Sequence, residues 1–226
     1  MQRVGSANRP RRLARWLCFP ALAILFSLNV GQAAENPNAL SSYTKQLIDL
    51  MNLFEKLDKA TADRMAANER YLMAKAMLRL SGGFYRLKED KARFARAVLL
   101  VIDSPRSAYD PMIYESSVLL QRTLNCLAAQ FRKDGPRIGA LVGFDGPSVA
   151  RQFEIRLDAK ARTVDKIVNE LGLDPAAPDL KEVVVKDAET AWDTADALYR
   201  KSVEIAHSLD SSVVPPDRPF CEFPPS

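Results

Sequence analysis

The chain has few of the side chains that most often perform catalysis or bind metals. Its 226 residues include one histidine, three cysteines and two tryptophans. Glu204 and His207 form a Glu-x-x-His pair, but a di-iron bundle needs this motif on two helices, and there is no second histidine. The sequence also lacks the Cys-x-x-Cys-His motif of covalently attached haem. We therefore predict no metal and no cofactor.

Catalytic motifs are equally scarce. His207 lies nine residues from core residue Leu198, which places it about 180° away around a helix, so we expect it to face solvent. Neither the Gly-x-Ser-x-Gly turn of a nucleophilic serine nor a phosphate-binding Gly-x-x-x-x-Gly-Lys-Ser/Thr loop is present. No catalytic residue is predicted, and the sequence favours a non-enzymatic protein. A helical cell-wall-active enzyme stays open as a third interpretation, because the two carboxylates of a glycosidase need no sequence motif.

In most of the chain, neither basic nor acidic residues are in excess. The 32 basic and 28 acidic residues give a net charge of +4. Five of the basic residues lie within residues 1–33, which hold no acidic residue, so 27 basic residues stand against 28 acidic ones in the remainder. There the two signs alternate, without the basic stripe that follows a phosphate backbone. We expect no nucleic-acid binding.

Long hydrophobic runs are limited to one, at residues 17–30. It follows a basic start and precedes the small residues Gly31 and Ala33, which is the pattern of a secretory signal peptide. Its 14 residues fall short of the roughly 20 that a spanning helix needs. We predict a signal peptide at 1–33, cleaved after Ala33 or, alternatively, Ala34; an uncleaved anchor is the competing interpretation. The mature protein would have no stable membrane anchor and would be periplasmic or secreted.

Cleavage would leave an even number of cysteines, Cys126 and Cys221. In an oxidising compartment such a pair favours a disulfide bond, with two separate thiols as the alternative. The bond would pin a proline-rich C-terminal tail, residues 213–226, to the rest of the domain.

Apolar residues recur every three or four positions along the mature chain, as in amphipathic helices. The predicted helices span 40–80, 84–103, 110–132, 147–171 and 179–209. We expect the first to be one long helix, locally unwound near residues 59–63 and ended by Gly82 and Gly83, although a break there is the alternative. No strand-like alternation is found. The sequence therefore predicts an all-α domain at 34–212, an antiparallel four- or five-helix bundle with long helices.

One connection, at residues 133–148, is rich in glycine and yet apolar. We predict a loop that contacts a partner through four apolar side chains, Ile138, Leu141, Val142 and Phe144. The alternative is a lid that folds over the bundle's own end.

The leading hypothesis for function is an exported, non-enzymatic helical-bundle protein that acts through protein–protein interaction, as an adaptor, inhibitor or chaperone-like protein. Its partner would be another exported or envelope protein. The second hypothesis is a periplasmic small-molecule-binding or sensor module. Its ligand would lie between helices, where Arg64, Asn68 and Lys75 interrupt the apolar pattern of the first helix. The oligomeric state is left open.

Overall fold

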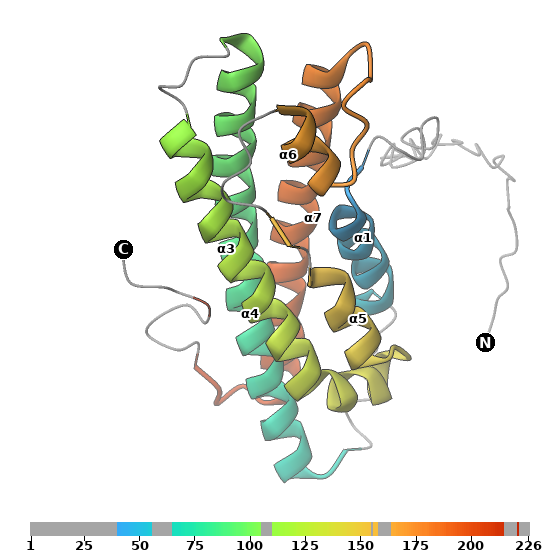
Figure 1. Ribbon diagram of the computed structural model, residues 1–226. Helices are drawn as coiled ribbons and strands as arrows, with labels where there is room; N and C mark the ends of the chain where they lie inside the picture. The colour runs from blue at the N-terminus through green and yellow to red at the C-terminus, as the bar shows by residue number, and fades with distance from the viewer. Residues whose placement is uncertain are drawn as a thin grey trace, which may run out of the picture. The chain divides into compact units, whose positions relative to one another are not determined.

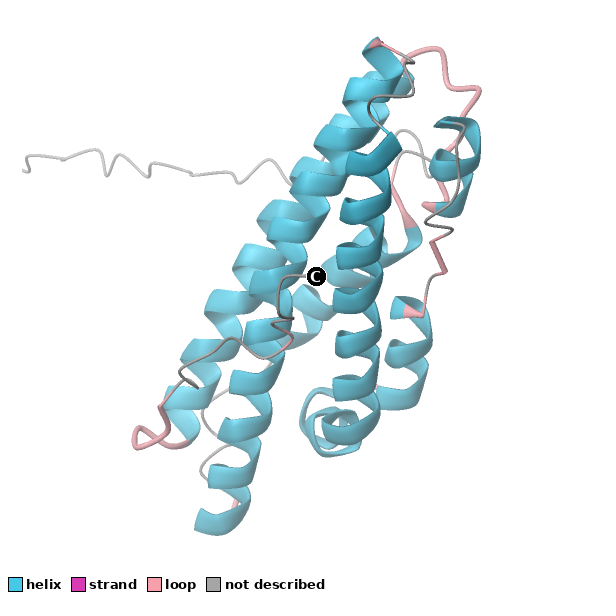
Figure 2. Ribbon diagram, turned by 60° about the vertical axis from the view of Figure 1, so that its left-hand side comes forward, coloured by secondary structure: helices cyan, strands magenta, loops and turns pink. Residues whose placement is uncertain are grey.

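The computed structural model describes residues 40–55, 65–104, 110–154, 156–157, 164–214 and 221. This part of the chain is all-α, without a strand, as Figure 1 and Figure 2 show. Its six helices are α1 (Ser42–Phe54), α3 (Ala67–Asp103), α4 (Asp110–Val142), α5 (Gly146–Phe153), α6 (Val164–Glu170) and α7 (Leu180–Leu209). The predicted signal peptide and both candidate cleavage sites lie outside the described residues.

Three long helices, α3, α4 and α7, pack together and carry most of the core. Between α3 and α4, the Arg79 guanidinium donates to the carboxylate of Asp134 at 2.8 Å and the Thr123 hydroxyl donates to the carboxylate of Asp90 at 2.7 Å. Because residue numbers rise along α3 while they fall along α4, these two helices are antiparallel.

Helix α7 also runs antiparallel to α3. The Lys88 amino group lies 2.6 Å from the Asp196 carboxylate, and the Lys181 amino group lies 2.8 Å from the Asp103 carboxylate. The observed α7 agrees with the helix predicted at 179–209. Ala191, Ala195 and Leu198 are buried, because a largely apolar stripe of α7, interrupted only by the buried Asp187 and Ser202, faces the core.

The short helix α1 lies beside α7 and is parallel to it. At its start the Ser41 backbone amide donates to Asp187 of α7 at 2.7 Å. At its end Phe54 packs edge-on against Phe84 of α3, with ring centroids 6.4 Å apart. The residues predicted to face inward in this segment, among them Tyr43, are fully buried. The predicted stripe is thus confirmed for the described part of α1.

The prediction of one long first helix ended by Gly82 and Gly83 is wrong. Helix α1 ends at Phe54, Met65 and Ala66 are not helical, and α3 then continues through both glycines to Asp103. The residues between 56 and 64, where a break was considered, lie outside the described residues. Glycine destabilises a helix interior by about 1 kcal/mol relative to alanine, but here it lets α4 approach, since a Cβ on Gly83 would lie 2.5 Å from the Leu127 side chain.

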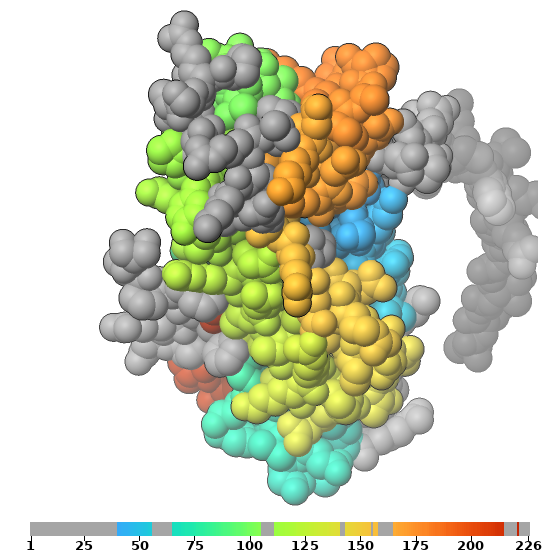
Figure 3. All heavy atoms as spheres, in the orientation of Figure 1, coloured from blue at the N-terminus to red at the C-terminus, as the bar shows by residue number. Residues whose placement is uncertain are grey.

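The glycine-rich connection is also mostly helical, contrary to the sequence-based expectation. Helix α4 continues past residue 132 and through Pro136 to Val142, and only residues 143–145 separate it from α5. The space-filling view in Figure 3 shows α5 directly against the C-terminal part of α4. A Cβ on Gly135 would lie 2.6 Å from the Gly146 Cα atom, so tertiary packing at this corner favours a conformation that local propensity does not.

The helix predicted at 147–171 is divided into α5 and α6. Helix α5 ends at Phe153, and residues 154, 156 and 157, which are described between α5 and α6, are not helical. Two side chains of α4 reach this break: Arg132 forms an ion pair with Glu154, and the Gln121 side chain accepts a hydrogen bond from the Leu157 amide at 2.5 Å. The Gln121 side chain of α4 therefore satisfies a backbone amide that a continuous helix would have paired internally, and no apolar pattern reveals this. Within the described residues, no helix is long and apolar enough to cross a membrane.

Candidate functional site

The predicted partner-contact residues lie where α4 turns into α5. Ile138 is fully buried, and the partly buried Phe144 packs against Phe131 with ring centroids 6.0 Å apart. Leu141 and Val142 form the last turn of α4, and the positions of their side chains are outside the description. The two placed side chains thus face the bundle itself, as in the alternative of a lid over its own end.

The predicted ligand-lining residues are not brought together around a cavity. Arg64 lies outside the described residues. Asn68 and Lys75 are exposed in the first turns of α3, and the Lys75 amino group lies 4.6 Å from the ring centroid of Tyr71. Neither residue lines either hollow described below.

The predicted disulfide bond between Cys126 and Cys221 is confirmed, with an S–S distance of 2.02 Å. It ties a buried residue of the C-terminal tail to the middle of α4, and the Gln130 side-chain amide lies 3.1 Å from the Cys221 sulfur. His207 is exposed, as predicted, and its neighbour Glu204 forms an ion pair with Lys201 at 2.9 Å. Among the described residues no group of three His, Cys, Asp or Glu side chains is placed to hold a metal ion.

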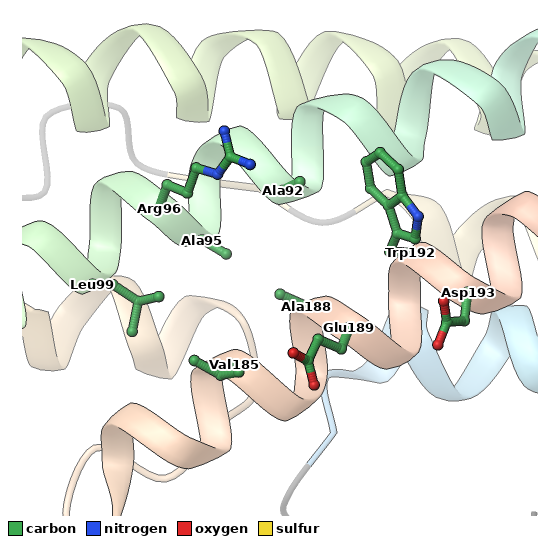
Figure 4. Close-up of a pocket in the computed structure, with 9 residues that line it drawn as sticks. All are labelled: Ala92, Ala95, Arg96, Leu99, Val185, Ala188, Glu189, Trp192 and Asp193. Carbon is green, nitrogen blue, oxygen red and sulfur yellow. The ribbon is translucent and has the colours of Figure 1, made fainter.

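A groove with a volume of about 560 Å³ lies between α3 and α7. Figure 4 shows the side chains of both helices around it. It is lined by Ala92, Ala95, Arg96 and Leu99 of α3 and by Val185, Ala188, Glu189, Trp192 and Asp193 of α7.

Small side chains form the floor of this α3–α7 groove. Ala92 and Ala95 of α3 lie opposite Ala188 of α7, so no long side chain fills the space between the two backbones. Leu99 and Trp192 stand at either side of this floor and remain partly exposed. Partly exposed aromatic and aliphatic side chains next to a low floor can contact another molecule without repacking the bundle.

Ion pairs between the helices bound the groove at both ends. At one end Lys88 pairs with Asp196, and its amino group lies 4.7 Å from the ring centroid of Tyr85 and 5.0 Å from that of Trp192. At the other end Lys181 pairs with Asp103. The α7 members of these two pairs, Lys181 and Asp196, lie about 22 Å apart along the helix at 1.5 Å per residue.

The rims of the groove carry opposite charges. Arg96 lies on the α3 rim, while Glu189 and Asp193 lie on the α7 rim. Within the described part of the chain, none of these three side chains forms an ion pair. Charges without a partner among the described residues are suited to pair with another molecule, and arginine and tryptophan are both enriched at protein interfaces.

A buried ion pair holds α3 and α7 together at the level of the groove. The Lys91 amino group lies 2.6 Å from the Asp187 carboxylate, which also accepts hydrogen bonds from the Ser41 amide at 2.7 Å and the Ser41 hydroxyl at 2.9 Å. The same amino group lies 4.8 Å from the ring centroid of Tyr43. This cluster ties the start of α1 to both walls of the groove.

The pKa values of the cluster follow from burial and from the ion pair. Burial alone would raise the pKa of Asp187, but the Lys91 ammonium and the hydrogen bonds outweigh it and hold this pKa below the usual 3.8. Burial would lower the pKa of Lys91, but the Asp187 carboxylate outweighs it and raises that pKa. Burial raises the pKa of Tyr43 to about 12. The two charged partners therefore stay ionised at neutral pH.

A second hollow lies between α4 and the segment after α5, and polar side chains surround it. It has a volume of about 580 Å³ and includes Arg132, Glu154 and Arg156. The Arg132–Glu154 ion pair and the hydrogen bond from Leu157 to Gln121 already occupy polar groups there. It offers less apolar surface to a partner than the α3–α7 groove does.

The sequence did not predict the α3–α7 groove, because the apolar pattern was used only to find the buried face of each helix and not its outward flank. One signal was present: Val185 and Trp192 are apolar, yet both lie off the buried stripe that contains Ala191 and Leu198. A second apolar stripe on a long helix indicates a second contact surface.

Compared with protein-family models, curated proteins and solved structures, the chain matches none of them.

Proposed function

We propose that this chain is an exported, non-enzymatic helical-bundle protein that acts through protein–protein contacts, as an adaptor, inhibitor or chaperone-like protein. The observation that carries the proposal is the α3–α7 groove, whose apolar floor lies between two rims of opposite charge. The charged side chains on these rims form no ion pair with any other described residue. Such a combination of partly exposed tryptophan, aliphatic side chains and charged rim is typical of a protein interface. We therefore assign the contact surface to the α3–α7 groove and not to the loop that the sequence predicted.

The proposal includes export and maturation. The signal peptide at 1–33 would be removed, and the mature domain at 34–212 would work in the periplasm or outside the cell, with its tail held by the Cys126–Cys221 disulfide bond. We propose further that the domain is an antiparallel bundle of five segments in which the fourth is divided into α5 and α6. Helices α3, α4 and α7 would then form a rigid support for the groove.

Site-specific photo-crosslinking in the native cell envelope tests this function. Ala92, in the groove, is replaced by a photoreactive phenylalanine analogue, and Ala140, an exposed alanine at the far end of α4, serves as the matched control. We expect a protein adduct at position 92 that is weak or missing at position 140, detected by mass shift on a gel and identified by mass spectrometry. Equal labelling at both positions, or none at position 92, would rule out the groove as the contact surface.

The second candidate function is a small-molecule-binding or sensor module. Its support is the volume of the groove, about 560 Å³, which falls within the range of about 300–1,000 Å³ for ligand sites. Native mass spectrometry of the mature protein from its own envelope distinguishes the two functions. A retained mass of small-molecule size would favour the second candidate, and a protein adduct favours the first.

A further inference from the structure

We propose that the occupant of the α3–α7 groove is a second copy of this chain, so that two grooves face each other across a two-fold axis that runs along them. This inference rests on the proposed role of the groove as a protein-contact surface. It adds the identity of the partner and the arrangement of the pair.

The charged residues on the two rims of the groove lie at similar heights along the helix axes. Three ion pairs, Lys88–Asp196, Lys91–Asp187 and Lys181–Asp103, fix which positions of α3 and α7 lie at the same height. Because α3 and α7 are antiparallel, each pair gives one estimate of which α7 position lies at the height of a given α3 residue. The mean of the three estimates places Arg96 level with about position 186 of α7, less than one helical turn from Glu189. Opposite charges thus lie on the two rims within one turn of the same height, and Asp193 lies about one turn further along the acidic rim.

The charges on the two rims are complementary to those of a second, identical groove. A two-fold axis along the groove places α3 of one copy over α7 of the other at the same height. Arg96 of each copy then lies opposite Glu189 of the other copy, with Asp193 about one turn further along the same rim, so that the opposite charges are paired twice. An axis across the groove would instead place Arg96 against Arg96 and the acidic rim against itself. Like charges at an interface disfavour association, so only the first arrangement is favourable.

Pairing of two grooves would also bury the apolar side chains that are partly exposed in each of them. Four helices, α3 and α7 from each copy, would enclose the partly exposed Leu99, Val185 and Trp192 of both copies. The low alanine floor leaves room for these side chains between the two layers, and a central tryptophan is a frequent anchor of interface energy. The Lys88–Asp196 and Lys181–Asp103 ion pairs would lie at the two borders of the interface, where charged residues are commonly found.

A charge-swap experiment on the purified full-length mature protein tests the proposal. One variant carries Arg96→Glu, and a second carries Glu189→Arg with Asp193→Arg. Arg93→Glu is the matched control, since Arg93 is also exposed on α3 but does not line the groove. Sedimentation equilibrium measures the dimer dissociation constant, and circular dichroism checks that each variant keeps its helicity.

We expect the wild type to form a dimer whose dissociation constant rises with salt. Each groove variant alone should dimerise about tenfold or more weakly, because its like charges now face each other, whereas Arg93→Glu should behave as the wild type. An equimolar mixture of the two groove variants should regain dimerisation as a heterodimer. In one half of that interface the introduced glutamate faces the two introduced arginines, and in the other half the wild-type pairing is kept. Native mass spectrometry separates this heterodimer from both homodimers by mass.

Two results would overturn the inference. One is a wild type that stays monomeric at its highest soluble concentration; the other is a dimer that the groove variants do not weaken. If the protein is monomeric and the photoreactive Ala92 variant captures a different protein, the second-copy inference fails while the proposed function stands. If Ala92 captures nothing and no dimer forms, both fail.

Discussion

At the scale of single residues, the Lys91–Asp187 pair is the interaction whose loss should matter most. Both side chains are almost completely buried, and the carboxylate has three polar partners, counting both hydrogen bonds from Ser41. Removing one member of such a pair leaves a buried charge without compensation, which is more costly than the net stabilisation that the intact pair supplies.

We predict that Lys91→Met lowers the free energy of unfolding by about 3–5 kcal/mol. The double variant Lys91→Met, Asp187→Asn should recover part of this loss, because the asparagine carries no charge and can still accept a hydrogen bond from Ser41. Urea denaturation followed by circular dichroism measures both values.

The exposed pair Lys181–Asp103 offers a matched control for this prediction. Lys181→Met should cost less than about 1 kcal/mol, because water screens and solvates exposed ion pairs. Equal effects of Lys91→Met and Lys181→Met would show that the buried pair does not hold α1, α3 and α7 together in the way described.

At the scale of elements, the corner between α4 and α5 depends on glycine at close approaches. A Cβ on Gly139 would overlap the carbonyl oxygen of Phe144, and one on Gly146 would lie 2.6 Å from the Gly135 Cα atom. Backbone atoms, unlike the ends of flexible side chains, cannot yield by a rotamer change. The helical conformation of α4 beyond residue 132 is therefore linked to the docking of α5.

We predict that Gly139→Ala lowers the free energy of unfolding by about 1–3 kcal/mol, the usual range for overpacking. Helix propensity by itself acts in the opposite direction, since alanine favours a helix over glycine by about 1 kcal/mol. The sign measured in thermal or urea unfolding therefore distinguishes the two effects. A stabilised Gly139→Ala variant would mean that the connection at residues 143–145 does not pack this closely against α4.

At the scale of the whole molecule, the disulfide bond closes a loop of considerable length. Cys126 and Cys221 are separated by 95 positions in the sequence, and the bond joins the C-terminal tail to the middle of α4. A cross-link of this span removes many conformations from the unfolded chain, which stabilises the folded one.

We predict that Cys221→Ser lowers the free energy of unfolding by about 2–5 kcal/mol. Cys126→Ser and the double variant should have the same effect, because each removes the same bond. A reducing agent should destabilise the wild type to a similar extent and leave the double variant unchanged. Different losses for the two single variants would indicate that the cysteines stabilise the protein through separate contacts.

The sequence allowed a good prediction where a single periodic pattern decides the structure. Helix α7 and the buried face of α1 were predicted closely, because apolar residues at steps of three and four have one favourable packing, against the core. The exposed position of His207 follows from the same geometry. The disulfide bond was predictable because only two cysteines follow the predicted signal peptide.

Other features depend on contacts between residues far apart in the sequence. Gly82 and Gly83 resemble a helix end in a local pattern, yet both lie inside α3, where a Cβ on Gly83 would lie 2.5 Å from the Leu127 side chain. The break after α5 similarly depends on Arg132 and Gln121, which belong to α4. A local pattern contains no information about such partners, so the helix boundaries at these places were predicted wrongly.

The sequence by itself determined that the described part of this protein is all-α and which face of its regular helices is buried, because periodicity is a property of the chain alone. It favoured the Cys126–Cys221 bond, which the structure confirms. Only the tertiary structure decided that α3 and α7 leave an alanine-floored groove between rims of opposite charge. The physical reason is that a groove is a property of two surfaces at a given height relative to each other. That height is set by side-chain pairs such as Lys88–Asp196 and Lys91–Asp187, whose members lie 108 and 96 positions apart in the chain.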